Sequence, residues 1–144
     1  MDRQVKQDIL ALVEGSRDAI ACSIDENGYP NAKTMFRARN EGLQTFWFST
    51  NTSAIRTGHW QKRPEASIYF VDHEGFHGLM LTGRMQVLTD DEIKASFWNE
   101  GDEKYYPLGP TDPDYCILRF TADKGNYYHG LRKHLFSVDE ARGW

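Results

Sequence analysis

The residues from Phe46 to Arg56 join an apolar, strand-like run to a cluster of small polar side chains and one guanidinium. The apolar run ends at Phe48, the polar residues Ser49–Ser53 follow, and the next segment is expected to form a helix with Arg56 in its first turn. A helix N-terminus leaves backbone N–H groups unpaired and carries partial positive charge, which suits an anion. The pattern therefore predicts a phosphate site that combines hydroxyls, backbone donors and one arginine.

The same corner also has a simpler interpretation, because Ser, Thr and Asn are the ordinary residues that cap helix N-termini. If the helix began near Ser53, Thr52 and Ser53 would share a face with Arg56, which follows them by four and three residues. Capping and phosphate binding are both compatible with this stretch taken alone.

A second group of candidate binding residues lies on the strand that is expected to precede this corner. Alternation along that strand places four long side chains on one face: Lys33, Met35, Arg37 and Arg39. Thr34 falls on the other face. Alternate cations on a strand are usually solvated. Beside a phosphate corner, they could instead face the negatively polarised edge of a heterocycle.

The segment His73–His77 reads HEGFH and matches the H-E-x-x-H pattern of zinc proteases. That chemistry needs both histidines on one face of a helix, with the glutamate beside the metal-bound water. Strand-like runs lie on both sides, and Gly75 and Gly78 disfavour a helix between them. A hairpin loop without a metal is therefore expected.

The composition is typical of a single soluble domain spanning residues 1–144, with 40% hydrophobic and 26% charged residues. A net charge of −4 argues against a nucleic-acid partner. No run approaches the length of a membrane span and no signal-peptide core is present, so a cytoplasmic location is expected. Cys22 and Cys116 lie in apolar runs, where free thiols are usually buried and inert, so neither a disulfide nor a thiol nucleophile is expected.

Short strands joined by tight turns dominate the expected secondary structure. Strands are expected over residues 19–24, from 29 to a turn at 40–42, and over 43–48, 66–71, 76–88 and 115–121, with a short seventh at 127–129. Helices are expected over 2–14 and 53–62, and from a capping box at Thr89–Glu92 to about residue 99. No G-x-G-x-x-G or Walker lysine motif is present, so a Rossmann site has no support. The pattern predicts a mainly β fold, a six- to seven-stranded antiparallel barrel with flanking helices, with an open α+β sheet as the alternative.

The order of these pieces resembles the FMN-binding split-barrel superfamily of pyridoxamine 5'-phosphate oxidases, and within it the general-stress-protein branch. Four segments carry the resemblance: DENGYPNAKTM at 25–35, the corner at 46–56, PEASIYF at 64–70 and GLMLTG at 78–83. The match runs in one colinear order over roughly residues 5–122, which is far more specific than any single motif. It implies a split barrel of Greek-key type.

The resemblance also implies a homodimer with one FMN at each end of its interface. Lys33, Thr34 and Met35 would lie along the flavin ring, and Arg37 would contact either the ring or the phosphate. The ribityl chain and phosphate would be held by residues of the corner: Ser49, Thr50, Asn51, Ser53 and Arg56. The second subunit is expected to contribute from near Trp98 and the Tyr105–Tyr106 loop.

The expected function is that of an FMN-dependent oxidoreductase acting on a small substrate, in which the flavin transfers electrons and the protein orients it. A cation at Lys33 or Arg37 would stabilise reduced, anionic flavin. No side chain stands out as a catalytic acid or base. The segment Tyr127–His134 does not match the tryptophan- and arginine-bearing segment with which true pyridoxamine phosphate oxidases hold their substrate, so vitamin B6 oxidation is not expected. Alternatives are a non-enzymatic flavin or haem module for stress or storage, a deazaflavin-dependent reductase, and a structural barrel without a cofactor.

Overall fold

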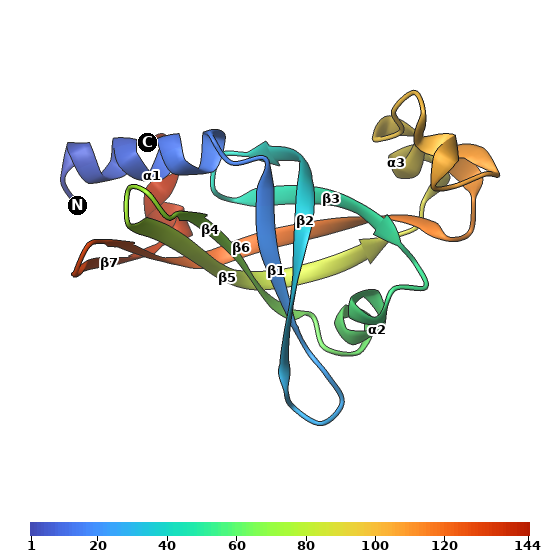
Figure 1. Cartoon of the computed structure of the whole chain (residues 1–144), viewed down its shortest axis with the longest axis horizontal. Coiled ribbons are helices and arrows are strands. Elements are labelled where there is room, and N and C mark those ends of the chain that lie inside the picture. Colours follow the sequence, from blue (N-terminus) through green and yellow to red (C-terminus); the bar gives the residue numbers. More distant parts are fainter.

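Seven antiparallel strands make up most of the molecule, whose computed structural model describes residues 1–144. They lie in the order β3-β2-β1-β4-β5-β6-β7, and β3 also pairs with β6. This additional pairing closes six strands into a barrel and leaves β7 as an extension beside β6 (Figure 1). The strands are β1 (Asp18–Ile24), β2 (Pro30–Glu41), β3 (Thr45–Asn51), β4 (Glu65–Asp72), β5 (His77–Leu88), β6 (Tyr115–His129) and β7 (Arg132–Ser137).

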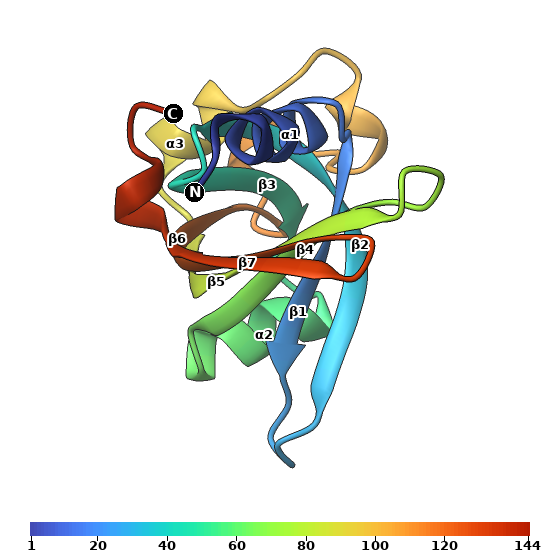
Figure 2. The same ribbon diagram turned by 90° about the vertical axis from the view of Figure 1, so that its left-hand side faces the viewer.

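Three α-helices flank the barrel: α1 (Arg3–Glu14), α2 (Ile55–Lys62) and α3 (Asp91–Ser96). Short 3-10 helices follow at Asp102–Lys104, Gly109–Thr111 and Val138–Ala141. Helix α1 packs against β4 and β5 at one end of the barrel, and α2 contacts β1 and β5 (Figure 2). Helix α3 and the loop after it lie at the opposite end of the molecule from α1 (Figure 1). None of the helices is long and apolar enough to cross a membrane.

Alternation of side chains along the strands builds one main core inside the barrel. Every second residue of β1 and of β3 is buried, as expected for strands with one face toward a core. The main core contains 22 buried residues, among them Phe46, Phe48, Phe70 and Phe120. A smaller cluster beneath α3 contains Phe97, Tyr106, Tyr115 and Ile117. This second cluster holds the loop that follows α3 against the barrel.

The mainly β barrel and the first helix were predicted correctly, and the strands expected over 19–24 and from residue 29 pair as a hairpin of β1 and β2. In the hairpin turn, the Asp25 carboxylate accepts hydrogen bonds from the backbone N–H groups of Asn27 and Tyr29, both at 2.9 Å. Gly28 has a φ of +84°, a conformation that glycine adopts without strain. The alternative of an open sheet is excluded by the pairing of β3 with β6.

The predicted ends of several elements were wrong. Strand β6 runs without a break from Tyr115 to His129, so the expected short strand at 127–129 is its second half. It stays extended because β5 pairs along its length, while β3 pairs with its first half and β7 with its second. Strand β7 itself was not predicted. Leu135 within β7 and Leu131 just before it are both exposed. Apolar and polar residues therefore do not alternate clearly along this segment.

The predicted capping box before α3 is also wrong. Asp90, not Thr89, is the N-cap residue, and its side chain makes no capping hydrogen bond. The helix ends at Ser96 rather than near residue 99. It ends early because Phe97 and Trp98 pack into the second cluster. Tertiary packing of these aromatic side chains therefore overrides the helical pattern.

Candidate functional site

The corner between β3 and α2 differs in detail from its prediction. Strand β3 does not end at Phe48 but continues to Asn51, because Ser49, Thr50 and Asn51 pair with residues of β6. Helix α2 begins only at Ile55, so neither Thr52 nor Ser53 is helical and the predicted shared helical face does not form. The N-cap residue is Ala54, which offers no capping side chain, and the first turn contains no acidic residue. No residue of the helix itself therefore offsets the partial positive charge at its start.

Arg56 projects from this first turn with part of its hydrogen-bonding capacity unused. Its Nη2 donates to the Thr50 Oγ1 at 2.6 Å, which fixes the guanidinium against β3. Its Nε is buried and has no hydrogen-bond partner. Arg56 makes no ion pair, since the only two in the molecule are His77–Asp72 and Arg142–Asp139. An unpaired donor on a cation can form a charged hydrogen bond to an anion.

Arg56 lies in the wall of a cavity of about 550 Å³. Three parts of the chain line it: strand β2, the β3–α2 corner, and the loop after α3. The lining residues are Thr34, Met35, Phe36, Arg37, Ala38, Ser49, Arg56, Asn99, Asp102, Tyr105 and Tyr106. Five of the nine predicted binding residues are therefore brought together here, namely Thr34, Met35, Arg37, Ser49 and Arg56. The volume falls in the range of ordinary cofactor and ligand pockets.

The other four predicted residues do not line this cavity. Lys33 is exposed on β2, where it pairs with Ala21 of β1. Thr50 is buried and acts through its hydrogen bond from Arg56. Asn51 and Ser53 turn their donors toward a carboxylate of the same chain, that of Asp114. No sequence signal indicated this partner, which lies more than 60 residues further along the chain.

Arg37 has a structural role that the sequence did not reveal. Its Nη1 donates to the carbonyl oxygen of Val13 at 2.5 Å and its Nη2 to that of Glu14 at 3.5 Å, so the guanidinium caps the C-terminal end of α1. Burial lowers the pKa of Arg37, while the nearby Glu14 charge opposes that shift. Arg37 therefore joins α1 to the cavity wall.

The expectation that Arg39 shares a face with Arg37 was wrong. A bulge shifts the register between them, so Arg37 lies opposite the buried Phe48 whereas Arg39 lies opposite Trp47. Neighbouring residues of β3 point to opposite faces, and the two arginines therefore separate. The Arg39 guanidinium lies over the rings of Trp47 and Phe97, with 5.2 and 4.4 Å between its central carbon and the ring centroids.

Two aromatic rings in the cavity wall are unusually exposed. Phe36 and Tyr105 each leave 70% of their surface accessible. Tyr106 beside them is buried in the second cluster, and burial followed by nearby groups raises its pKa to about 12. Tyr105 and Tyr106 line the cavity together with residues of β2 from the same chain, and a contribution of this loop to the site of a second subunit stays a prediction. Phe36, Asn99 and Asp102 were missed, because their proximity depends on how the loop after α3 folds back.

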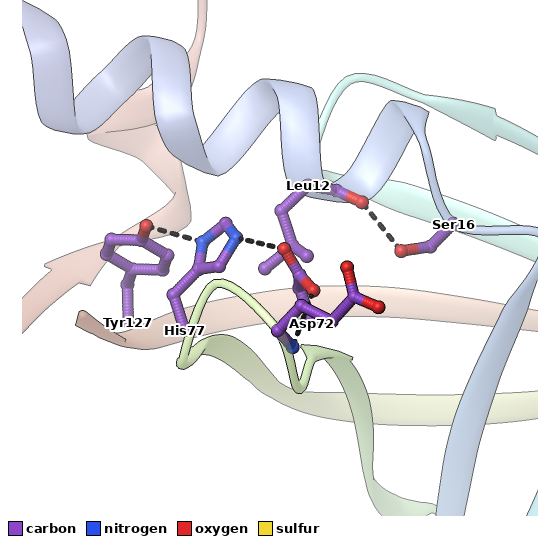
Figure 3. Close-up of polar contacts among 6 residues, drawn as sticks. Leu12, Ser16, Asp72, His77 and Tyr127 are labelled. Atoms are coloured by element: carbon purple, nitrogen blue, oxygen red, sulfur yellow. Dashed lines mark hydrogen bonds and ion pairs between the residues drawn. The ribbon is translucent and has the colours of Figure 1, made fainter. Parts of the chain in front are cut away.

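Residues 73–76 form the turn between β4 and β5, as the sequence predicted, and His77 begins β5 (Figure 3). The His77 ring links two strands: its Nε2 lies 3.1 Å from an Asp72 carboxylate oxygen and its Nδ1 lies 2.8 Å from the Tyr127 hydroxyl. Hydrogen bonds from the Gly75 backbone and from His77 hold the pKa of Asp72 below its usual range. Burial raises the pKa of Tyr127.

A wider hollow of about 640 Å³ lies beside this turn, between the end of α1 and the hairpin. Both ring nitrogens of His77 already have partners, so its imidazole offers no free ligand. No group of three or more His, Cys, Asp or Glu side chains is arranged to hold a metal ion. This end of the molecule is therefore a mutually satisfied structural cluster, and the β2–corner cavity is the better candidate for binding.

The protein is a closed six-stranded antiparallel barrel with a cavity between β2 and the β3–α2 corner. Comparison with known proteins then identifies its family. Residues 5–129 match the family model of pyridoxamine 5'-phosphate oxidase, and the chain belongs to this family. No protein of curated function matches the chain.

Solved structures support the same assignment. A Clostridium acetobutylicum protein related to general stress protein 26 of Bacillus subtilis, of the pyridoxinephosphate oxidase family, is 43% identical with a TM-score of 0.88 over 98% of this chain and 99% of that chain. More distant structures show the fold alone. A Nostoc punctiforme FMN-binding protein related to pyridoxamine 5'-phosphate oxidase is 14% identical, with a TM-score of 0.65 over 92% and 88%. A Mycobacterium smegmatis haem-binding protein is 15% identical, with a TM-score of 0.72 over 96% and 60%.

Proposed function

We propose that this protein binds FMN in the β2–corner cavity and acts as a flavin-dependent oxidoreductase on a small substrate. One observation carries the proposal: a single cavity is lined both by an arginine with an unpaired, buried Nε and by two strongly exposed aromatic rings. The first suits a phosphate and the second suits a planar ring. FMN carries both groups on one molecule.

The phosphate would bind at the start of α2. Arg56 supplies a charged donor there, Ser49 supplies a hydroxyl in the same wall, and the uncapped helix start adds partial positive charge. Thr50 contributes indirectly, because its hydroxyl accepts a hydrogen bond from Arg56 and fixes the guanidinium. This arrangement resembles the anion sites that other helix N-termini form.

The flavin ring would lie along β2. Thr34 lines this wall with Phe36 and Tyr105, whose rings offer exposed aromatic surface, and the chain at Met35 also borders the cavity, although the Met35 side chain is buried in the core. The bound flavin would supply the electron transfer, while these residues orient the ring and exclude water from it. No histidine lines the cavity, which favours FMN over haem because haem iron commonly takes an axial histidine.

A second copy of the chain would complete the site. Register places one row of neighbours across five strands: Ile20, Tyr69, Met80, Asn126 and Leu135. Phe36 and Thr34 extend the same sheet face on β2, and both also line the cavity. Met80, Leu135 and Phe36 leave 36%, 67% and 70% of their surface accessible. An exposed apolar face of this kind marks an association surface, and here it is continuous with the cavity wall.

Titration with FMN tests the proposal, with riboflavin as the control that lacks a phosphate. Binding of FMN at micromolar affinity or better, with much weaker binding of riboflavin, is the expected result. Reduction of the bound flavin by NADH or NADPH and its reoxidation by an acceptor then tests the oxidoreductase role. Protein that binds neither flavin would overturn the proposal, and flavin that no donor reduces would favour a storage or sensing module instead.

A further inference from the structure

Asp114 places a negative charge at the corner where the proposed phosphate site lies. Its Oδ2 accepts a hydrogen bond from Asn51 Nδ2 at 2.9 Å, and its Oδ1 accepts one from the Ser53 backbone N–H at 2.8 Å. Its backbone carbonyl also accepts from the Thr52 N–H at 2.8 Å. Asp114 thus accepts hydrogen bonds from groups that were expected, from the sequence, to bind a phosphate.

The charge of Asp114 is not neutralised by the arginine of the corner. Arg56 makes no ion pair, and its only hydrogen bond is to Thr50. Hydrogen bonds from Ser53 and Asn51 hold the pKa of Asp114 below its usual range, so its carboxylate is ionised at neutral pH. The corner therefore contains a fixed anion and a separate, unpaired cation.

The Asp114 carboxylate is hydrogen-bonded to the backbone N–H of Ser53, which precedes Arg56 by three residues, so this charge lies beside the start of α2. Cys116, a buried residue of β6, lies within the influence of both groups: the Asp114 charge raises its pKa and the Arg56 charge lowers it, although burial is the largest cause of its raised pKa. The Asp114 charge also contributes, after burial and Cys116, to the raised pKa of Tyr106, which is a cavity-lining residue. An anion bound at Arg56 would therefore be repelled by Asp114.

We propose that Asp114 is a specificity-determining residue, a built-in anion that limits how much negative charge the corner accepts and so favours a single phosphate monoester over a diphosphate. The inference rests on the proposed function, because it concerns the same site. Asp114 occupies the donors on one side of the corner and leaves Arg56 as the main charged donor for the ligand. A second phosphate would meet the Asp114 carboxylate instead of further donors.

Asp114→Asn separates the effect of the Asp114 charge from that of its hydrogen bonds to Asn51 and Ser53. The asparagine oxygen can still accept from the Ser53 N–H, and its amide can donate to Asn51 if the Asn51 side chain flips. The substitution therefore removes one negative charge while keeping both contacts. Asp123→Asn is the matched control, because Asp123 is an exposed acid outside the cavity wall and its loss changes the net charge equally.

The experiment compares wild type, Asp114→Asn and Asp123→Asn by titration with FMN and riboflavin at low and high ionic strength. The Asp114 variant should bind FMN roughly three- to tenfold more tightly at low salt, as expected for removing a like charge at close range. The gain should shrink at high salt, and the affinity for riboflavin should not change. Unchanged or weaker FMN binding by a folded Asp114→Asn variant would overturn the inference.

A second arm needs no flavin and separates the two proposals. Thermal unfolding is measured with inorganic phosphate and with pyrophosphate, and the shift in unfolding temperature reports anion binding. Asp114→Asn should increase the shift with pyrophosphate more than the shift with phosphate, and Asp123→Asn should change neither. If wild type fails to bind FMN, the proposed function fails, while this arm still decides the role of Asp114. Equal responses of the three proteins would reject that role.

Discussion

The polar groups at the two ends of the barrel differ in how completely they are hydrogen-bonded. At the β4–β5 hairpin, Asp72, His77 and Tyr127 satisfy one another, and His77 has no free ring nitrogen. At the β3–α2 corner, Arg56 retains an unpaired, buried Nε and the helix start has no capping side chain. Buried polar groups normally find partners, so the unsatisfied end is the one that indicates a ligand. The sequence motif that looked most like a catalytic centre, HEGFH, lies at the satisfied end.

Replacing Arg56 tests the unsatisfied end and should have the largest effect. Arg56→Ala is expected to weaken FMN binding by about 1.5–3 kcal/mol, the range for a hydrogen bond to a charged group. Isothermal titration or flavin fluorescence measures this change. Arg119→Ala is the control, since Arg119 bonds only to Gln86 on an exposed surface. An Arg56 variant that binds FMN as tightly as wild type would contradict the assignment of the phosphate site.

Replacing His77 tests the satisfied end and should change stability instead of binding. His77→Ala leaves the hydroxyl of the buried Tyr127 without its partner, which costs about 1–3 kcal/mol of unfolding free energy. Urea unfolding measures this loss, and His134→Ala serves as the comparison because His134 only stacks on Tyr127. FMN affinity should stay at its wild-type value. A marked loss of FMN binding in His77→Ala would show that the hairpin end also contributes to binding, against this prediction.

Removing one exposed ring should have a smaller effect on binding. Tyr105→Ala or Phe36→Ala is expected to weaken FMN binding by about 0.5–1.5 kcal/mol, the typical worth of an aromatic pair. Neither ring is buried, so the unfolding free energy should change little. Leu108→Ala is a suitable control, because Leu108 is 72% exposed and does not line the cavity. Binding that depends on neither ring would remove the argument for a planar ligand.

The smallest expected effect is a pH dependence shared by both ends. Asp72 and Asp114 have pKa values lowered by hydrogen bonds in the folded state. Their contribution to stability is therefore present above the unfolded pKa of about 3.9 and is lost as pH falls through the lower folded values. Unfolding measured from pH 6 downward should show this loss, and Asp72→Asn or Asp114→Asn should each flatten part of it. Profiles identical to wild type would show that these hydrogen bonds contribute no net stability.

Much of the fold could be predicted because its signals are local. The Asp25–Gly28 turn depends on a carboxylate and a glycine within four residues of each other, and its hairpin formed as expected. A helix was expected over 2–14, and the buried residues of α1, Ile9, Leu12 and Val13, have the spacing of one helical face. Both features arise from interactions between residues that are close in the sequence.

The errors concern features that depend on distant partners. The length of β3 depends on β6 pairing with Ser49–Asn51, some 65 residues away. The bulge that separates Arg37 from Arg39 depends on how β2 fits against β3. No local sequence pattern could reveal the length of β3 or the bulge in β2. Both are set by backbone hydrogen bonds to another strand that is distant in the sequence or joined through a turn.

For the candidate site, the sequence by itself determined the chemical groups and their approximate neighbourhood. Arg56, Ser49 and the polar residues before α2 belong to one short stretch, so their proximity is a property of the chain. Only the tertiary structure decided which of them face a cavity. It turned Asn51 and Ser53 toward Asp114, left the Nε of Arg56 unpaired, and brought Tyr105 to the same wall as Phe36. The physical reason is that each donor takes the best partner within reach, and the closure of the barrel determines which partners are within reach.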